Sequence, residues 1–116
     1  MKGVYAVYFQ LEEDTEVECG GLGEISFSAG TYVYVGSAMN SLESRIHRHF
    51  HSQEKKHWHI DYFSEKAEPE RVFFIFTEDS SLECELADFF SGKAEEVEGF
   101  GSSDCKCDSH LFGLLY

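Results

Sequence analysis

The chain has 116 residues, 22 acidic and nine basic side chains, and a formal net charge of −13. This length fits one domain over 1–116, and a hydrophobic content of 42% excludes a disordered chain. No apolar run reaches the roughly 20 residues that span a bilayer, and no signal peptide is present, so we expect a cytoplasmic protein with no membrane partner.

Basic side chains and histidines gather in one segment of this acidic chain, between residues 45 and 59. An acidic surface repels the phosphate backbone of nucleic acids, so the overall charge argues against a nucleic-acid-binding surface over the whole molecule. A single basic face on an acidic body remains compatible with the sequence.

The first third of the chain predicts strands. Residues 3–9 (GVYAVYF) are aromatic and β-branched, which favours a strand. The acidic stretch that follows, with CGGLGE, predicts a loop or hairpin turn. Residues 24–30 alternate apolar and polar side chains and 31–36 read TYVYVG, so we expect two further strands with Gly30 at the turn between them.

A helix is predicted next. Asn40 or Ser41 can cap it, and Glu43 lies three residues after Asn40, as in a capping box. An apolar stripe at a spacing of four is formed by Leu42, Ile46 and Phe50. Arg45 and His49 are also four residues apart, so they share a neighbouring row of the helix.

The rest of the chain predicts a mixture of elements. Residues 57–63 (HWHIDYF) fit either a short helix or an extended segment, and 71–76 (RVFFIF) predict a buried strand. Residues 81–90 predict a helix that ends at Gly92, with an apolar face of Leu82, Leu86, Phe89 and Phe90. The tail predicts a loop and a last strand. This order indicates an α+β domain, a small mixed or antiparallel sheet flanked by two or three helices.

Four segments carry a resemblance to a known group of enzymes. GVY at 3–5 and YVG at 34–36, followed by Arg45, resemble the GIY-YIG nuclease superfamily. YVGSAMNSLESRIHRHF at 34–50 is similar to the corresponding stretch of phage homing endonucleases. HWHIDYF and GFGSSDCKCDSHLF, at 99–112, resemble the small URI-like endonuclease family. The resemblance covers nearly the whole chain.

The resemblance implies a metal-dependent endonuclease that hydrolyses DNA phosphodiester bonds in DNA repair or processing. Members of the small family occur alone or fused to a DNA-repair glycosylase. Branched or damaged DNA is therefore the implied substrate, and a DNA-repair protein is an implied partner. The alternative is a catalytically inactive module with the same fold that binds nucleic acid or protein, which the charge of −13 favours.

The chemistry of phosphodiester hydrolysis agrees with several of these residues. It needs an activated water, charge stabilisation at the phosphate and usually a divalent metal. Arg45 can clamp a phosphate through its planar guanidinium, although it could also form a salt bridge with the acidic body. The resemblance implies that Tyr5 or Tyr34 activates or orients the water, and a pKa near 10 means that a basic role needs help from a metal or a cation.

Histidines and small or basic residues complete the implied site. The resemblance places one catalytic histidine at His49 and a further one at His57 or His59, between which the sequence does not choose. Asp61 is a candidate acid behind them, and Trp58 is interpreted as a packing residue. The implied substrate contacts are Gly36, Ser37, Arg48, Lys55 and Lys56.

The implied metal ligand is a glutamate on the later helix. Glu83 matches, with Leu86 three residues further on, and Glu85 is the second choice. A carboxylate that leaves room for waters suits one Mg²⁺ or Mn²⁺ ion. Glu83 has a purely structural alternative, because Ser80 and Glu83 have the spacing of a capping box.

Four cysteines are present, and a cytoplasmic chain is expected to keep them reduced. Cys105, Cys107 and His110 could bind zinc if His57 or His59 supplied a fourth ligand. The spacing is not a standard one for zinc, so a structural loop is the favoured interpretation. The gap between the two tyrosine motifs is longer than the superfamily usually shows, which predicts that CGGLGEISF is an insertion or an added hairpin.

Overall fold

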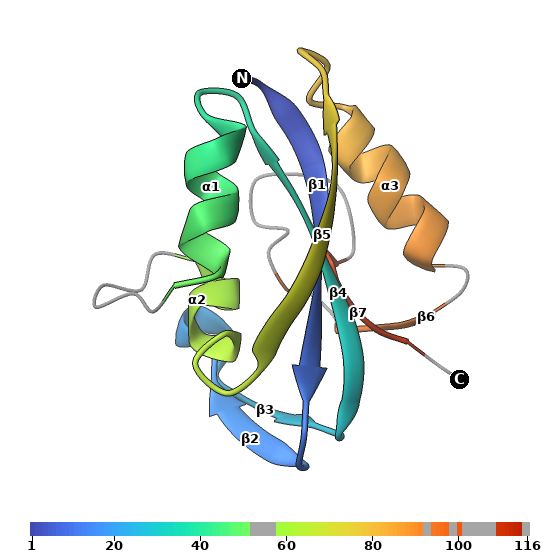
Figure 1. The fold of residues 1–116 in the computed structure, drawn as a ribbon. Coiled ribbons are helices and arrows are strands. Elements are labelled where there is room, and N and C mark those ends of the chain that lie inside the picture. Colours follow the sequence, from blue (N-terminus) through green and yellow to red (C-terminus); the bar gives the residue numbers. More distant parts are fainter. Residues whose placement is uncertain (52–57, 92–93, 98–99, 101–108, 115–116) are drawn as a thin grey trace.

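The computed structural model describes residues 1–51, 58–91, 94–97, 100 and 109–114, and an antiparallel sheet is its central feature (Figure 1). Five strands pair in the order β5-β1-β4-β7-β6. Their bounds are β1 (Gly3–Leu11), β4 (Gly30–Ala38), β5 (Glu68–Phe76), β6 (Ala94–Glu96) and β7 (Leu111–Leu114). Every pairing among them is antiparallel, which confirms the predicted fold class.

A second, two-stranded sheet accounts for the long gap between the tyrosine motifs. It pairs β2 (Thr15–Glu18) with β3 (Glu24–Phe27) through the short 3₁₀ helix η1 (Gly20–Leu22). The predicted hairpin is therefore present, although its strands take in part of the acidic stretch that was predicted as a loop. Gly30 opens β4 at a φ of 148°.

Helices cover both faces of the five-stranded sheet (Figure 1). α1 (Leu42–His49) and α2 (His59–Phe63) lie on one face, and α3 (Leu82–Ser91) lies on the other. Successive side chains of a strand point to opposite faces. Tyr5 of β1 accordingly belongs to the core beneath α1 and α2, whereas Ala6 belongs to the core with Ala87 of α3.

Two glycines of the tyrosine motifs are needed for close packing. A Cβ atom at Gly36 would lie 2.5 Å from both Cζ and the hydroxyl oxygen of Tyr5, which is the cross-strand partner of Gly36. A Cβ atom at Gly3 would collide with the carbonyl oxygen of Ile75 and lie 2.7 Å from Cδ2 of Leu42. Gly36 therefore leaves room for the Tyr5 ring, and Gly3 lets β5 and α1 approach β1.

The start of α1 differs in detail from the prediction. Ser41 is the N-cap, and its hydroxyl accepts a hydrogen bond from the backbone N–H of Ser44 at 3.2 Å. Glu43 lies 3.3 Å from the amino group of Met1 instead of completing a capping box with Asn40, so that detail of the prediction is wrong.

The predicted apolar faces are only partly correct. Leu42 of α1 is buried, but Phe50 is 37% exposed and the neighbouring His49 is buried in its place. On α3, Phe89 is 55% exposed, and the small Ala87 contacts the sheet. The prediction is therefore correct for Leu42, Leu86 and Phe90 and wrong for Phe50 and Phe89.

The prediction of a buried strand at 71–76 is wrong about burial. The residues do form a strand, but β5 is the outermost strand of the sheet. Four consecutive large side chains, Phe73, Phe74, Ile75 and Phe76, are exposed. β6 is a further difference, because its acidic sequence did not predict a strand.

Two remaining expectations concern membranes and cysteines. In the described part of the chain no helix is long and apolar enough to cross a membrane.

Cys19 is a buried free thiol, whereas Cys84 is disulfide-bonded, so the expectation that all four cysteines are reduced is wrong for Cys84.

Candidate active site

Tyr5, Tyr34 and His49 form a buried cluster beneath α1. The tyrosines come from the paired strands β1 and β4, and His49 is the last residue of α1. The hydroxyl of Tyr5 lies 2.7 Å from Nε2 of His49. The imidazole ring is 5.2 Å from the ring centre of Tyr5 and 5.5 Å from that of Tyr34. Side chains 44 residues apart in the chain therefore meet, as the resemblance implied.

Burial sets the protonation of all three groups. It lowers the pKa of His49 to about 4, an effect that Asp61 opposes and that Arg45 and Arg48 reinforce. Burial also raises the pKa of Tyr5 and of Tyr34 well above the ordinary value. At neutral pH the imidazole and both phenols are uncharged, so the hydrogen bond between Tyr5 and His49 joins two neutral groups.

Arg45 brings positive charge to the same place. Its guanidinium lowers the pKa of Tyr5 by its charge and by a hydrogen bond, against the larger effect of burial. Nη1 of Arg45 donates to the backbone oxygen of Ser37 at 3.1 Å. Ser37 follows Gly36 on β4, so Arg45, the two tyrosines and the end of this strand occupy one neighbourhood.

Both arginines of α1 stack on the indole ring of Trp58. The guanidinium carbons of Arg45 and Arg48 lie 4.3 Å and 4.7 Å from the centre of the indole ring. Arg48 also forms an ion pair with the buried Asp61 at 2.8 Å, and Asp61 accepts a bond from the backbone N–H of Trp58 at 3.1 Å. Such cation–π and ion-pair contacts restrict where the guanidinium groups can lie.

The sequence did not reveal this role of Trp58. Its interpretation as a packing residue is correct as far as it goes, but the surface it offers is for guanidinium groups. Two arginines three residues apart on a helix were the available signal. The sequence alone did not indicate that Trp58 and Asp61 contact these arginines, because the contact depends on how α2 packs beside α1.

Glu83 approaches the cluster from α3. Its negative charge contributes to the raised pKa values of Tyr5 and Tyr34. One carboxylate oxygen lies 3.5 Å from Nδ1 of the buried His110, which also lies 3.0 Å from the backbone oxygen of Val35. The side chain of Glu83 is 21% exposed, so it is partly accessible to solvent.

The capping alternative for Glu83 is not what α3 uses at its start. There, Oδ1 of Asp79 accepts bonds from the backbone N–H of Ser81 at 3.0 Å and from its hydroxyl at 2.6 Å. The carboxylate of Glu83 is directed to His110 instead. Glu85, the second choice for a metal ligand, is exposed.

Comparison with known proteins places the chain in a family. A family model described as "Domain of unknown function DUF123" matches residues 4–115. The chain belongs to the DUF123 family. No curated protein and no solved structure matches it. The match covers the first tyrosine motif from Val4 on, the whole of the second, α1, Glu83 and β7, so it includes every residue of the candidate site described above.

The metal expectation can be tested on the donors that this DUF123 chain offers. Among the described residues no group of three or more His, Cys, Asp or Glu side chains is arranged to hold a metal ion. Mg²⁺ keeps several waters and often takes only one or two protein carboxylates, the rest coming from substrate phosphates. The single accessible carboxylate of Glu83 fits that kind of site.

Other predicted site residues of the DUF123 chain lie elsewhere or outside the description. His59 is half-buried, its ring is 5.5 Å from that of Phe100, and burial lowers its pKa. Phe100 in turn contacts Tyr34 at 6.3 Å between ring centres, so the ring of Phe100 lies between His59 and the cluster of Tyr5, Tyr34 and His49. Five predicted residues fall outside the described residues: Lys55, Lys56, His57, Cys105 and Cys107.

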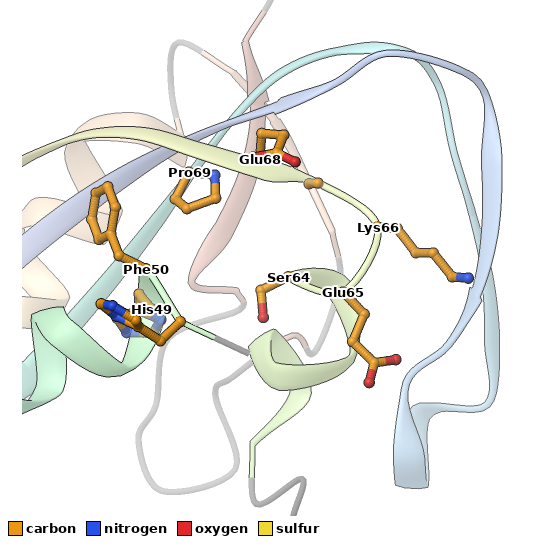
Figure 2. A pocket seen from close by; sticks show the side chains of 9 residues that line it. His49, Phe50, Ser64, Glu65, Lys66, Glu68 and Pro69 are labelled. Carbon is orange, nitrogen blue, oxygen red and sulfur yellow. The ribbon is translucent and has the colours of Figure 1, made fainter. Parts of the chain in front are cut away.

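A hollow of about 520 Å³ opens beside His49 (Figure 2). Its lining includes His49 and Phe50 from the end of α1 and Ser64, Glu65 and Lys66 from the turn after α2. In Figure 2 these two groups lie on opposite sides of the hollow. The buried imidazole therefore has a polar opening next to it.

Proposed function

We propose that this DUF123 protein is a GIY-YIG-type endonuclease that hydrolyses DNA phosphodiester bonds with the help of a divalent metal. The observation that carries the proposal is the hydrogen bond between Tyr5 and the neutral His49, with Tyr34, Arg45 and Glu83 around it. Two protonated phenols, a neutral imidazole, a guanidinium and a carboxylate supply the groups that phosphate hydrolysis uses.

The proposed proton transfer runs from a water through Tyr5 to His49. A water beside Tyr5 gives a proton to the phenol oxygen while the phenol proton passes to Nε2 of His49. The water becomes hydroxide-like and attacks phosphorus, and His49 becomes an imidazolium that loses its proton to solvent through the adjacent hollow. A pKa of about 4 means that the imidazolium gives up its proton readily at neutral pH.

Arg45 opposes the high pKa of the buried phenol and is available to stabilise negative charge on the phosphate. A divalent ion held by Glu83 would act as a Lewis acid on the phosphate oxygens. Tyr34, with its pKa raised by burial, keeps its proton and can donate a hydrogen bond to a phosphate oxygen or to the leaving group.

The substrate class follows from charge and size. Arg45 and Arg48 share one indole ring on a chain with a net charge of −13, and Arg48 is also paired with Asp61, so the basic spot is small. So few phosphate contacts suit a branched or damaged DNA recognised by shape, or DNA delivered by a repair partner, better than a long sequence-specific site.

The test is cleavage of nicked, flapped, branched and plain duplex DNA in Mg²⁺ or Mn²⁺. The wild-type protein is expected to cleave at least one of these substrates. Arg45→Ala and Glu83→Gln are each expected to lower the rate about 100-fold or more, because each removes charge stabilisation of the transition state. Arg71→Ala and Glu85→Gln are matched controls on β5 and α3, and both are expected to cleave like the wild type.

Two results would decide against the proposal. Cleavage that survives in both Arg45→Ala and Glu83→Gln would come from another site or a contaminant. If no substrate is cleaved but Arg45→Ala weakens DNA binding, the protein is a binding module that has the fold without the activity.

A further inference from the structure

The outer strand β5 presents large apolar side chains to solvent. Phe73, Phe74, Ile75 and Phe76 are 62%, 49%, 52% and 53% exposed. β5 is the last strand in the sheet order, and in the described part of the chain no strand pairs with its outer side. Figure 1 looks onto this edge, with α1 to one side of β5 and α3 to the other.

Both faces of this edge are apolar. Phe74 lies opposite Tyr5 and Phe73 lies opposite Ala6, so neighbouring residues of β5 point to opposite faces. Phe74 and Phe76 are in ring contact at 5.2 Å on one face, and Phe73 contacts the edge of Tyr8 at 5.6 Å on the other. An exposed strand that is apolar on both faces is a rare surface, and such patches mark interaction sites.

Proteins usually protect an edge strand with proline, charge or a bulge. β5 has these devices only in its first third, where Pro69 and the exposed Glu68 and Glu70 lie beside a register shift with β1. The segment 72–76 has none of them. The unprotected stretch is therefore short and has a defined position.

Acidic residues bound this stretch at both ends. Glu68 and Glu70 precede it, and the exposed Glu78 and Asp79 follow it. Two cations lie nearby: Arg71 is over the ring of Tyr8 at 5.1 Å, and Nζ of Lys2 lies 3.7 Å from Oε1 of Glu78, so these acids outnumber the cations at each end. An occupant of the edge therefore meets apolar surface in the middle and negative charge at both ends.

Charge also argues against a second copy of the chain as the occupant. An antiparallel copy centred on Phe74 would pair 72–76 with the same apolar residues, but it would set Glu70 opposite Glu78 twice. Each copy also has a net charge of −13. A nucleic acid is disfavoured for the same reason, because its phosphates would face the acidic ends.

We propose that residues 72–76 of β5 dock an extended segment of a partner protein, with an apolar centre and Lys or Arg at both ends. The segment adds to the sheet as a further strand, so main-chain hydrogen bonds give affinity and the flanking charges give specificity. This interaction surface is independent of the proposed nuclease activity.

Two labelled peptides with the same centre test the proposal by fluorescence anisotropy: Lys-Lys-Val-Val-Phe-Val-Val-Lys-Lys and Glu-Glu-Val-Val-Phe-Val-Val-Glu-Glu. The basic-flanked peptide is expected to bind about tenfold or more tightly than the acidic one at low salt, with a smaller difference as salt rises. Binding is also expected to slow hydrogen exchange of alternate amides of β5, those on the outer side.

Variants locate the site. Phe74→Thr and Ile75→Thr each place a β-branched side chain suited to a strand and remove apolar surface, so both are expected to weaken peptide binding about tenfold. Phe89→Ser is the matched control, an exposed phenylalanine on α3, and is expected to bind the peptide like the wild type. Circular dichroism checks that each variant is folded.

Four outcomes would overturn the proposal. The two peptides could bind equally, or neither could bind. The protein could form a dimer in sedimentation that Phe74→Thr abolishes, which would make a second copy the occupant. It could instead bind a single-stranded oligonucleotide of about 15 nucleotides through Phe74, which would make the edge a base-stacking surface.

Discussion

The site beneath α1 buries polar side chains, whereas the edge formed by β5 exposes apolar ones. Tyr5 and His49 are 1% and 4% exposed, although both carry polar atoms, while the apolar Phe73 is 62% exposed. Burying polar groups costs free energy, and exposing apolar ones forfeits the gain of burial. Both regions therefore depart from what stability alone would favour, and such departures are expected at functional surfaces.

The two departures also differ from each other. The buried cluster is supported by specific contacts: the Tyr5–His49 hydrogen bond and the Arg48–Asp61 ion pair. The β5 edge lacks comparable support, because much of its apolar surface is open to solvent. Substitutions in the first region should therefore change stability strongly, and substitutions in the second should change it little.

The largest expected effect on stability comes from the titration of His49. Its pKa in the folded protein is about 4, below the ordinary value of 6.5, so the unfolded chain takes up a proton first as the pH falls. The resulting stability is fully present above pH 6.5 and is lost as the pH falls towards 4, by about 3 kcal/mol in total. Urea unfolding across this range measures it.

His49→Gln tests this assignment, and His51→Gln is its matched control. The first is expected to lose this component of the pH dependence, because the titrating group is gone. The second removes an exposed histidine two residues further on and is expected to keep the wild-type slope. Equal slopes in wild type and His49→Gln would show that His49 is not buried as a neutral imidazole.

The next effect concerns the ion pair behind the arginines. Asp61→Asn removes the carboxylate charge that lies 2.8 Å from the partly buried Arg48 and weakens the bond to the backbone N–H of Trp58. We expect the free energy of unfolding to fall by about 2 kcal/mol, less than for a fully buried pair because Arg48 is 21% exposed. Glu12→Gln, which alters an exposed acid, should change it by less than about 0.5 kcal/mol.

Gly36→Ala tests the close packing of Tyr5. The new methyl group would lie 2.5 Å from the phenol, so the ring or the strand must shift. A loss of about 1 to 2 kcal/mol in thermal unfolding is expected, as for other overpacked sites. Gly21→Ala is the control, since a Cβ atom there has no neighbour within 4 Å. Equal stability of the two variants would contradict the packing described here.

The smallest effect is expected at the exposed edge. Phe73→Thr should change the free energy of unfolding by less than about 0.5 kcal/mol, because Phe73 is mostly exposed and threonine suits a strand. The measurement is urea unfolding at neutral pH. A loss above about 2 kcal/mol would mean that the edge belongs to the core and would remove the contrast between the two regions.

Much of the fold was predictable from the sequence because it depends on local patterns. The alternation in β1 and β4 and the four-residue spacing in α1 are of this kind, and both tyrosine motifs and Arg45 are readable from short segments. The gathering of Tyr5, Tyr34 and His49 followed from the resemblance rather than from any pattern in the chain.

The parts that failed depend on long-range arrangement. RVFFIF has the composition of a central strand, and only the pairing order reveals that it lies at an edge. Phe50 was predicted from its spacing to lie on the apolar face of the helix. Instead His49 is the buried residue, and it is hydrogen-bonded to Tyr5, while Phe50 is exposed. Trp58 acquires its role only from the position of α2 beside the arginines.

The most direct test of the central claim is single-turnover cleavage of DNA by Tyr5→Phe, compared with Tyr32→Phe. Tyr32 is a buried tyrosine of β4 whose hydroxyl donates to the backbone oxygen of Ser28, so its loss is a matched structural change. Tyr5→Phe is expected to cleave about 100-fold or more slowly than the wild type, while Tyr32→Phe is expected to keep the wild-type rate. Cleavage by Tyr5→Phe at the wild-type rate would contradict the role of the Tyr5–His49 pair in hydrolysis.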